Sequence, residues 1–185
     1  SLPNDKYYRI SVKREEDGLV SNYLHDTLCQ GDKIRVNPPY GSLCLKDADK
    51  PVVLISGGVG ITPMMSILQD AADQKLSRQI HFIHGTRNRN THAFKDDVIT
   101  LTSDHDNFKH HYFYSRDSVK SADTRPGRMT INSIKEIIGH IKDAEFYICG
   151  PAQMMKYLYR ELINWGVTPD NIVYEYFGPK RDITG

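Results

Sequence analysis

Residues 52–63 read Val-Val-Leu-Ile-Ser-Gly-Gly-Val-Gly-Ile-Thr-Pro, and this stretch decides the fold. Its continuous apolar start predicts a strand that is buried on both faces of a parallel sheet. The three glycines predict a tight turn, and Pro63 suits the first turn of a helix, where its missing N–H costs no hydrogen bond. A strand–turn–helix unit of this kind offers free N–H groups and a positive helix end, which favour a bound phosphate.

From Pro51 onward, strand patterns alternate with helical patterns. This alternation predicts an α/β fold, with a five-stranded parallel sheet of order 3-2-1-4-5 and helices on both faces. The polar residues 116–129 predict a loop. The strands are expected at residues 52–56, 79–84, 109–115, 145–149 and 171–176, and the helices at 63–75, 93–101, 131–141 and 154–165, with Gly166 ending the last helix.

Residues 1–49 have a different character and predict β structure around one short helix between Val20 and Cys29. Alternating residues at 7–13, 33–36 and 42–45 predict strands. These strands are too few to close a barrel. We therefore interpret the segment as the C-terminal half of an antiparallel β-barrel whose first half lies upstream of Ser1. The expected domains are residues 1–49 and 50–185.

The composition excludes several classes of function. The 185 residues include 24 Lys and Arg against 23 Asp and Glu, a net charge of +1. This balance gives no bulk attraction to nucleic acid or to an anionic membrane, and the longest apolar run is too short to span a bilayer. The 3 cysteines have no zinc-site spacing and are too few for an iron–sulfur cluster. A cytoplasmic protein without nucleic-acid or membrane partners is expected.

A second glycine-containing turn, Cys149-Gly150-Pro151, follows the fourth expected strand. In the predicted order this strand is a neighbour of the first, so both turns meet at the carboxyl edge of the sheet. Open α/β sheets bind their ligands at that edge. Alone, the first turn could be a connection without a ligand, and Cys149 a packing residue. Their common position favours ligand binding.

Three weaker patterns each leave two interpretations open. Tyr176 and Phe177 could stack on a flat ring system or cover the edge of the sheet. Gly18 to Ser21, before a short helix, could hold a phosphate or form an ordinary capped turn. Basic residues after the second and third strands suit phosphate recognition but also a solvated surface. These basic residues are Arg87, Arg89, Arg116 and Lys120.

The histidines do not predict a metal site. His81 and His84 are three residues apart on an expected strand, so their side chains point to opposite faces and are poor co-ligands. His110 and His111 alternate in the same way. The sequence also has neither a Gly-x-Ser-x-Gly elbow nor a P-loop, which argues against a hydrolase and a nucleoside triphosphatase.

Taken together, these stretches resemble the ferredoxin–NADP reductase superfamily, and within it the reductase part of flavohemoglobins. The resemblance implies an enzyme that passes a hydride from NADPH or NADH to FAD, and electrons onward to a globin haem or an iron–sulfur partner. The matching residues are 7–15, 18–25, 54–64, 92–94, 149–151 and 174–179, in family order.

The resemblance also implies roles for single residues. It places Thr62 near the flavin and nicotinamide rings, Cys149 beside the nicotinamide, and Glu175 near the hydride path. The turn at 57–63 would bind the pyrophosphate of the nicotinamide dinucleotide, and residues 18–21 that of FAD. The other implied cofactor-binding residues are Ser1, Val12, Lys13, Gly18, Leu19, Val20, Ser21, Gly57, Gly58, Val59, Gly60, Pro63, Arg87, Ser115, Arg116, Gly150, Pro151, Met154, Tyr176, Phe177, Gly178 and Pro179.

Departures from the family pattern leave alternatives open. About half of the FAD barrel and any globin segment are missing from the sequence. A truncated module that binds pyridine nucleotides without flavin, or a non-enzymatic scaffold that docks to a redox partner, therefore remains open. Arg87 and the Ser115-Arg116 pair favour NADPH slightly over NADH.

Overall fold

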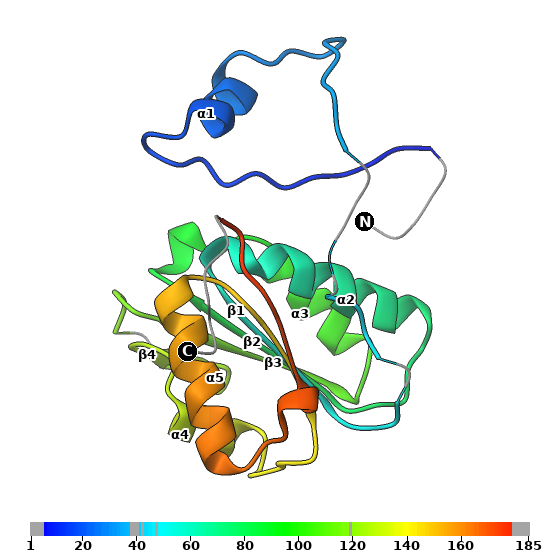
Figure 1. Cartoon of the computed structure of the whole chain (residues 1–185), viewed down its shortest axis with the longest axis vertical. Coiled ribbons are helices and arrows are strands. Elements are labelled where there is room, and N and C mark those ends of the chain that lie inside the picture. The colour runs from blue at the N-terminus through cyan, green and yellow to red at the C-terminus, as the bar shows by residue number, and fades with distance from the viewer. Residues whose placement is uncertain (1–5, 38–40, 42, 47, 119, 179–185) are drawn as a thin grey trace. The chain divides into compact units, whose positions relative to one another are not determined.

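The computed structural model describes residues 6–37, 41, 43–46, 48–118 and 120–178 (Figure 1). The chain divides into two compact units, Pro3–Gly41 and Ser42–Gly185. The assignment of these parts to FAD and NAD(P) stays a prediction.

The second unit is built on a six-stranded parallel sheet of order β4-β3-β2-β1-β5-β6. The five predicted strands occur in the predicted order, and the three-residue β4 adds a sixth at the edge beside β3. The loop expected at 116–129 is therefore wrong at β4, which has no strand pattern of its own and ends in a proline at the sheet edge. The strands are β1 (Val52–Gly57), β2 (Ile80–Thr86), β3 (Phe108–Tyr114), β4 (Thr124–Pro126), β5 (Glu145–Cys149) and β6 (Ile172–Glu175).

Helices cover both faces of this sheet, as predicted. Helices α2 (Ile61–Asp73) and α3 (Lys95–Ser103) pack on one face, and α4 (Ile131–Ile137) and α5 (Ala152–Trp165) on the other (Figure 1). Side chains of β1 alternate between the two cores, because successive residues of a strand point to opposite faces. In the described part of the chain, no helix combines the length and the apolar character that a membrane span requires.

The first unit contains one helix, α1 (Leu19–Asp26), and no strand among its described residues. The strands expected at 7–13 and 33–36, and at 43–45 in the second unit, are therefore not formed. Alternation predicts which side chains share a face, but a strand needs a neighbour for its ladder of hydrogen bonds, and these residues have none within the described chain. The half-barrel stays a prediction.

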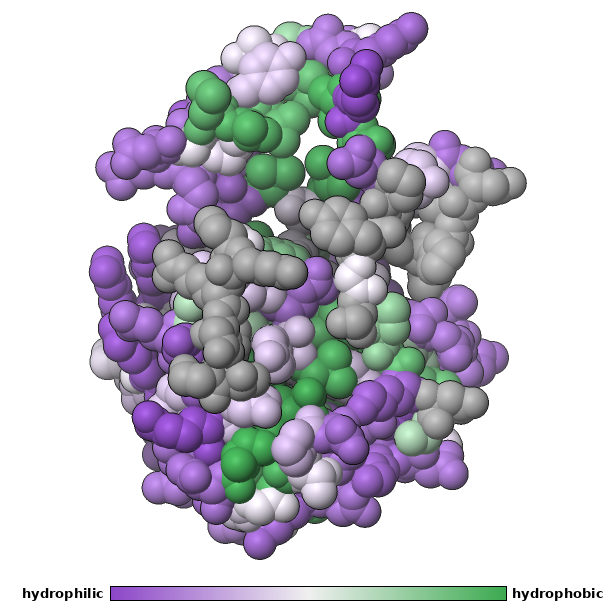
Figure 2. Space-filling model, in the orientation of Figure 1, coloured by the Kyte–Doolittle hydropathy of each residue, from purple (hydrophilic) through white to green (hydrophobic). Residues whose placement is uncertain are grey.

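Side-chain contacts hold α1 to the segment before it. Arg14 donates two hydrogen bonds to Asp26, at 2.6 and 2.8 Å, and His25 Nε2 lies 2.9 Å from the carbonyl oxygen of Val12. No residue of α1 is buried, and Leu19 is 87% exposed. Apolar side chains are visible on the surface of this part of the chain (Figure 2).

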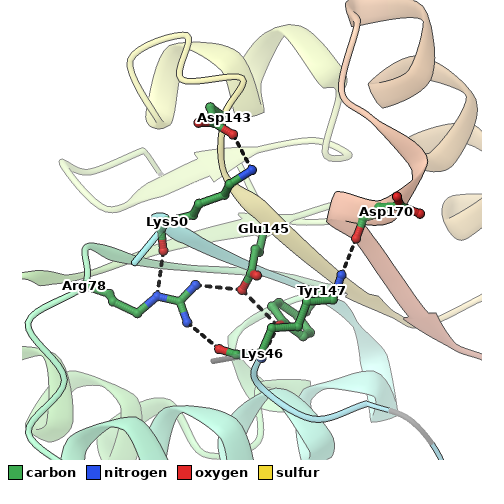
Figure 3. A network of polar contacts seen from close by, with 7 residues as sticks. All are labelled: Lys46, Lys50, Arg78, Asp143, Glu145, Tyr147 and Asp170. Carbon is green, nitrogen blue, oxygen red and sulfur yellow. Dashed lines mark hydrogen bonds and ion pairs between the residues drawn. The ribbon is translucent and has the colours of Figure 1, made fainter. Parts of the chain in front are cut away.

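A buried polar network lies at the amino ends of β2 and β5 (Figure 3). Arg78 Nη2 is 2.6 Å from Glu145 Oε2, and both side chains are less than 10% exposed, at 7% and 3%. The same guanidinium donates to the carbonyl oxygens of Lys50, at 2.7 Å, and Lys46, at 3.0 Å. The Tyr147 hydroxyl donates to Glu145 and accepts the Lys46 N–H. This network fixes Lys46 and Lys50 at the amino end of the sheet, opposite to the glycine-rich turn.

Candidate functional site

The two predicted turns meet in direct backbone contact at the carboxyl edge of the sheet. Strands β1 and β5 are neighbours, with Ser56 opposite Cys149. A Cβ on Gly60 would lie 2.1 Å from the carbonyl oxygen of Cys149 and 2.8 Å from the nitrogen of Gly150. A Cβ on Gly150 would lie 3.0 Å from the nitrogen of Gly57. The predicted meeting of the turns is confirmed, and it needs the absence of side chains at both contact points.

The glycines of the first turn have different roles. Gly57 and Gly60 are buried and leave room for the neighbouring turn; a Cβ on Gly57 would lie 2.7 Å from the sulfur of Met154 and 2.9 Å from Pro151. Gly58 is exposed, has a φ of +55°, and has open space around its Cβ position. Glycine suits this position because residues with a side chain rarely adopt a left-handed backbone conformation. Of these three glycines, Gly58 is the one that is exposed to solvent.

A helix start lies directly above this contact. A short 3-10 turn, Gly58–Gly60, leads into α2, which begins at Ile61 rather than at Pro63 as expected. Pro63 still lies in the first helical turn, as predicted. The Thr62 hydroxyl donates to the carbonyl oxygen of Val59 at 3.1 Å, so it is held within the turn. The Ile61 N–H already donates to the carbonyl oxygens of Gly58 and Val59. The start of a helix still carries partial positive charge, so this edge suits an anion.

Cys149 and Glu175 are neighbours on β5 and β6 at the same edge. Burial, followed by the nearby carboxylate of Glu175, raises the pKa of the Cys149 thiol to about 12. The thiol is therefore neutral near pH 7, whereas a nucleophilic cysteine needs a lowered pKa. This agrees with a contact role and argues against covalent chemistry.

The aromatic residues after β6 have different environments. Tyr176 is half-buried and packs against the core on the α4 and α5 face, which is the edge-covering interpretation. Phe177 is 47% exposed. Gly178 lies close to the Tyr176 ring, since a Cβ there would be 2.7 Å from it.

Basic residues lie side by side after β2 and β3. The N–H of Ser115 donates to the carbonyl oxygen of Thr86 at 3.0 Å, and that of Arg116 to the carbonyl oxygen of Arg87 at 2.8 Å. Ser115, Arg87 and Arg116 are exposed. The structure thus brings together the three residues that favour NADPH slightly over NADH by resemblance.

The residues predicted to contact FAD in the first unit surround the start of α1. Gly18 is the N-cap, and no side chain caps the helix there. The Ser21 hydroxyl accepts the Glu15 N–H at 3.1 Å and donates to the carbonyl oxygen of Gly18 at 3.2 Å, so it stabilises the turn. Lys13 pairs with Glu15. Leu19 and Val20 are exposed, the Val12 carbonyl contacts His25, and Ser1 and Pro179 lie outside the described residues.

Sequence reasoning missed a buried polar row beneath the turns. Ser56 Oγ is 2.9 Å from His84 Nδ1, and His92 Nδ1 is 2.7 Å from the Tyr114 hydroxyl. Burial lowers the pKa of His84 to about 3 and that of His92 to about 4, so both rings are neutral. For Ser56 and His84 the signal was visible as polar residues at strand positions that are otherwise apolar, whereas His92 lies in the loop before α3 and gave no such signal.

The other face of β2 confirms the alternation of its histidines. His81 stacks on His111 with ring centroids 6.2 Å apart, on the face opposite to His84. Among the described residues, no three His, Cys, Asp or Glu side chains are grouped so that they could hold a metal ion.

Comparisons with known proteins agree with this geometry. Residues 54–160 match the oxidoreductase NAD-binding domain family. The flavohemoprotein of Bacillus cereus is 42% identical over 191 residues, which cover 98% of this chain and 47% of that protein. The flavohemoprotein of Pseudomonas aeruginosa is 39% identical over 176 residues, or 95% of this chain and 44% of that one. The chain thus spans about half the length of these curated relatives.

Solved structures have the same fold. The flavohem-like FAD/NAD binding domain of nitric oxide dioxygenase from Vibrio cholerae is 35% identical, with a TM-score of 0.81 over 91% of this chain and 70% of that chain. A ferredoxin NADP+ reductase from Neisseria gonorrhoeae is 22% identical, with a TM-score of 0.74 over 88% of this chain and 71% of that chain. The chain therefore belongs to the oxidoreductase NAD-binding domain family, and within it to the flavohem-like FAD/NAD binding domains.

Proposed function

We propose that this chain binds NADPH or NADH at the two glycine turns and passes its hydride to FAD, from which electrons continue to a haem or iron–sulfur acceptor. The observation that carries the proposal is the backbone contact of Gly60 with Cys149 and Gly150 beneath the start of α2. The flavohemoprotein relatives and the FAD/NAD binding domain from Vibrio cholerae support the same assignment.

The pyrophosphate of the dinucleotide belongs at the start of α2. Gly58 offers exposed backbone there, and the helix end supplies N–H groups and a positive dipole. The turn is pre-organised, because Gly60 is packed against the neighbouring turn and Thr62 is bonded to Val59. Binding an anion therefore orders little further backbone, which favours affinity.

The nicotinamide belongs beside Cys149 and Glu175. Hydride transfer depends on holding donor and acceptor in line and on excluding water. The buried, neutral thiol of Cys149 contacts the nicotinamide ring without ionising and without attacking it. Glu175, one strand further, places a carboxylate at the same edge.

The first unit fits FAD at the start of α1, where no side chain caps the helix and Leu19 and Val20 are exposed. The N–H groups of residues 19–21 are then the donors for its pyrophosphate, with the Ser21 hydroxyl stabilising the turn. FAD, when bound, supplies the hydride-accepting chemistry.

NADPH is the preferred reductant in this proposal. Arg87, Ser115 and Arg116 lie side by side and exposed, and a guanidinium fork suits a phosphate better than a ribose hydroxyl. Charge-assisted hydrogen bonds of this kind contribute roughly 1.5–3 kcal/mol each. Loss of Arg116 should therefore weaken NADPH by about ten-fold or more and NADH far less.

The test is anaerobic reduction of FAD, added to the chain, by NADPH and by NADH. Flavin bleaching is expected with both, faster with NADPH, and Arg116→Ala should reduce that advantage. Arg160→Ala, an exposed arginine on α5, is the control and should change neither rate. Cys149→Ser should slow bleaching more than it weakens dinucleotide binding. No bleaching with either reductant, or an equal loss for both in Arg116→Ala, would contradict the proposal.

A further inference from the structure

The loop between β2 and α3 carries Arg87 and Arg89 and is internally rigid. The Asn88 side chain accepts the Thr91 N–H at 3.2 Å, and the Asn88 N–H donates to the Thr91 hydroxyl at 3.2 Å. The Thr86 hydroxyl is 3.0 Å from the same Thr91 hydroxyl. Such reciprocal capping fixes the backbone of a short turn.

The first end of this loop is joined to the loop after β3 through the backbone. The N–H groups of Ser115 and Arg116 donate to the carbonyl oxygens of Thr86 and Arg87. Further along, Arg89 Nε lies 3.5 Å from Asp117 Oδ2, so an ion pair also links the two loops.

The second end is held by His92. Its Nδ1 is 2.7 Å from the hydroxyl of Tyr114, the residue directly before Ser115. The buried His92 ring also stands edge-on to Tyr112, with centroids 4.4 Å apart, and lies 5.0 Å from His84. Two residues later, Phe94 has a φ of +58°, which is unusual for a large side chain. Its packing against the core compensates this strain.

Tyr114 lies at the junction of the two loops. Burial raises the pKa of its hydroxyl, and both Arg89 and Asp117 act on it electrostatically. The hydroxyl that bonds to His92 is therefore close to the charges that link the loops.

We propose that His92 is a positioning residue for the preference between 2′-phosphorylated and unphosphorylated dinucleotides. Its hydrogen bond to Tyr114 anchors the end of the Arg89 loop that leads into α3. This anchor keeps the arginines of the two loops at fixed positions relative to Ser115. This rests on the proposed function. A phosphate needs several donors held together, and each donor that must first be ordered costs affinity. A ribose hydroxyl needs fewer charged donors, so it depends less on the anchor.

The chain supplies a matched pair of variants for the test. Tyr112 and Tyr114 are both on β3, both 1% exposed and both edge-on to His92. The Tyr114 hydroxyl bonds to His92, whereas that of Tyr112 has no hydrogen-bond partner among the described residues. Tyr114→Phe thus removes the anchor with the ring retained, and Tyr112→Phe removes only an unused hydroxyl.

Dissociation constants of NADP+ and NAD+ for the whole chain, measured by calorimetry, give the readout. Tyr114→Phe should weaken NADP+ about five-fold, or ~1 kcal/mol, and NAD+ less than two-fold. Tyr112→Phe should leave both constants unchanged. In a double-mutant cycle, His92→Leu should add little to Tyr114→Phe, because both remove the same bond.

The outcomes separate the two proposals. Equal weakening of both dinucleotides by Tyr114→Phe, or the same loss in Tyr112→Phe, would overturn the positioning role of His92. No binding of either dinucleotide by the unsubstituted chain would overturn the proposed function itself. If His92→Leu does not fold, the tyrosine pair alone decides the matter.

Discussion

Adding one methyl group at Gly60 should separate the two turns that form the site. The added Cβ would lie 2.1 Å from the carbonyl oxygen and 2.4 Å from the carbonyl carbon of Cys149. Real contacts of this kind are about 3.4 Å or longer, so the backbone of one turn must shift by roughly 1 Å. The neighbouring atoms are main chain, and no rotamer change can relieve the contact.

The change in unfolding free energy caused by Gly60→Ala is the sum of two opposing effects. Overpacking costs roughly 1–3 kcal/mol, and the rigid neighbours place Gly60→Ala at the upper end. Gly60 has right-handed helical angles, with φ −61° and ψ −5°, so alanine gains about 0.4–1 kcal/mol from the unfolded chain. The expected net loss is about 2 kcal/mol.

Gly58→Ala is the matched control, two residues away in the same turn. Its Cβ meets no atom within 4 Å, so only the left-handed backbone at φ +55° opposes the change. That strain costs roughly 1–2 kcal/mol before the same gain of 0.4–1 kcal/mol is subtracted. The expected net loss is roughly 0–1.6 kcal/mol, and the contact between the turns is retained.

Urea unfolding followed by fluorescence of the single tryptophan, Trp165, is the assay. Trp165 packs on Phe146 in the second unit and therefore reports that unit. A Gly60→Ala chain as stable as Gly58→Ala would refute the inference that the two turns are in direct backbone contact.

Three further predictions concern the second unit. Burial holds the pKa of His84 near 3 and of His92 near 4, below the ordinary 6.5, so the unfolded chain takes up protons first as the pH falls. The unfolding free energy should therefore fall from about pH 6.5 toward pH 4, by up to ~1.4 kcal/mol per pH unit for each ring, and a flat urea-midpoint profile would contradict this. Glu145→Gln breaks the buried ion pair with Arg78 and should lower the unfolding free energy by about 3–5 kcal/mol. The control Glu136→Gln breaks the more exposed ion pair with Arg125 and should lower it by less than about 0.5 kcal/mol. Similar losses in the two variants would contradict a stabilising role of the buried network. Iodoacetamide at pH 8 should label the two exposed cysteines but not the buried, neutral Cys149 until urea is added, and mass spectrometry of native protein with three adducts would contradict its burial.

The arrangement of the second unit was predictable because local and global patterns agree there. The apolar run at 52–55 must be covered on both faces, and only alternating helices do that. The placing of the Cys149-Gly150 turn beside the Gly57 turn then follows from the strand order. Strand β4 could not be predicted, because its three residues become a strand only by pairing with β3.

Other features depend on contacts between distant residues. The sequence indicated that glycines 57–60 allow a close approach, but not that Gly60 approaches Cys149. From the sequence, His84 was considered only as a metal ligand and His92 only as part of a stretch that resembles the family, because their hydrogen bonds are to the distant residues Ser56 and Tyr114. The strands predicted at 7–13 and 33–36 failed because alternation describes faces and supplies no pairing partner.

The most direct test of the central claim is hydrogen–deuterium exchange of the whole chain with and without saturating NADP+. Exchange should be slower in peptides that contain residues 57–64 and 149–155, because the N–H groups of these turns contact the dinucleotide. Peptides from α4 should be unchanged, since this helix lies on the opposite face from α2. Saturation without protection at either turn would contradict the assignment of the site.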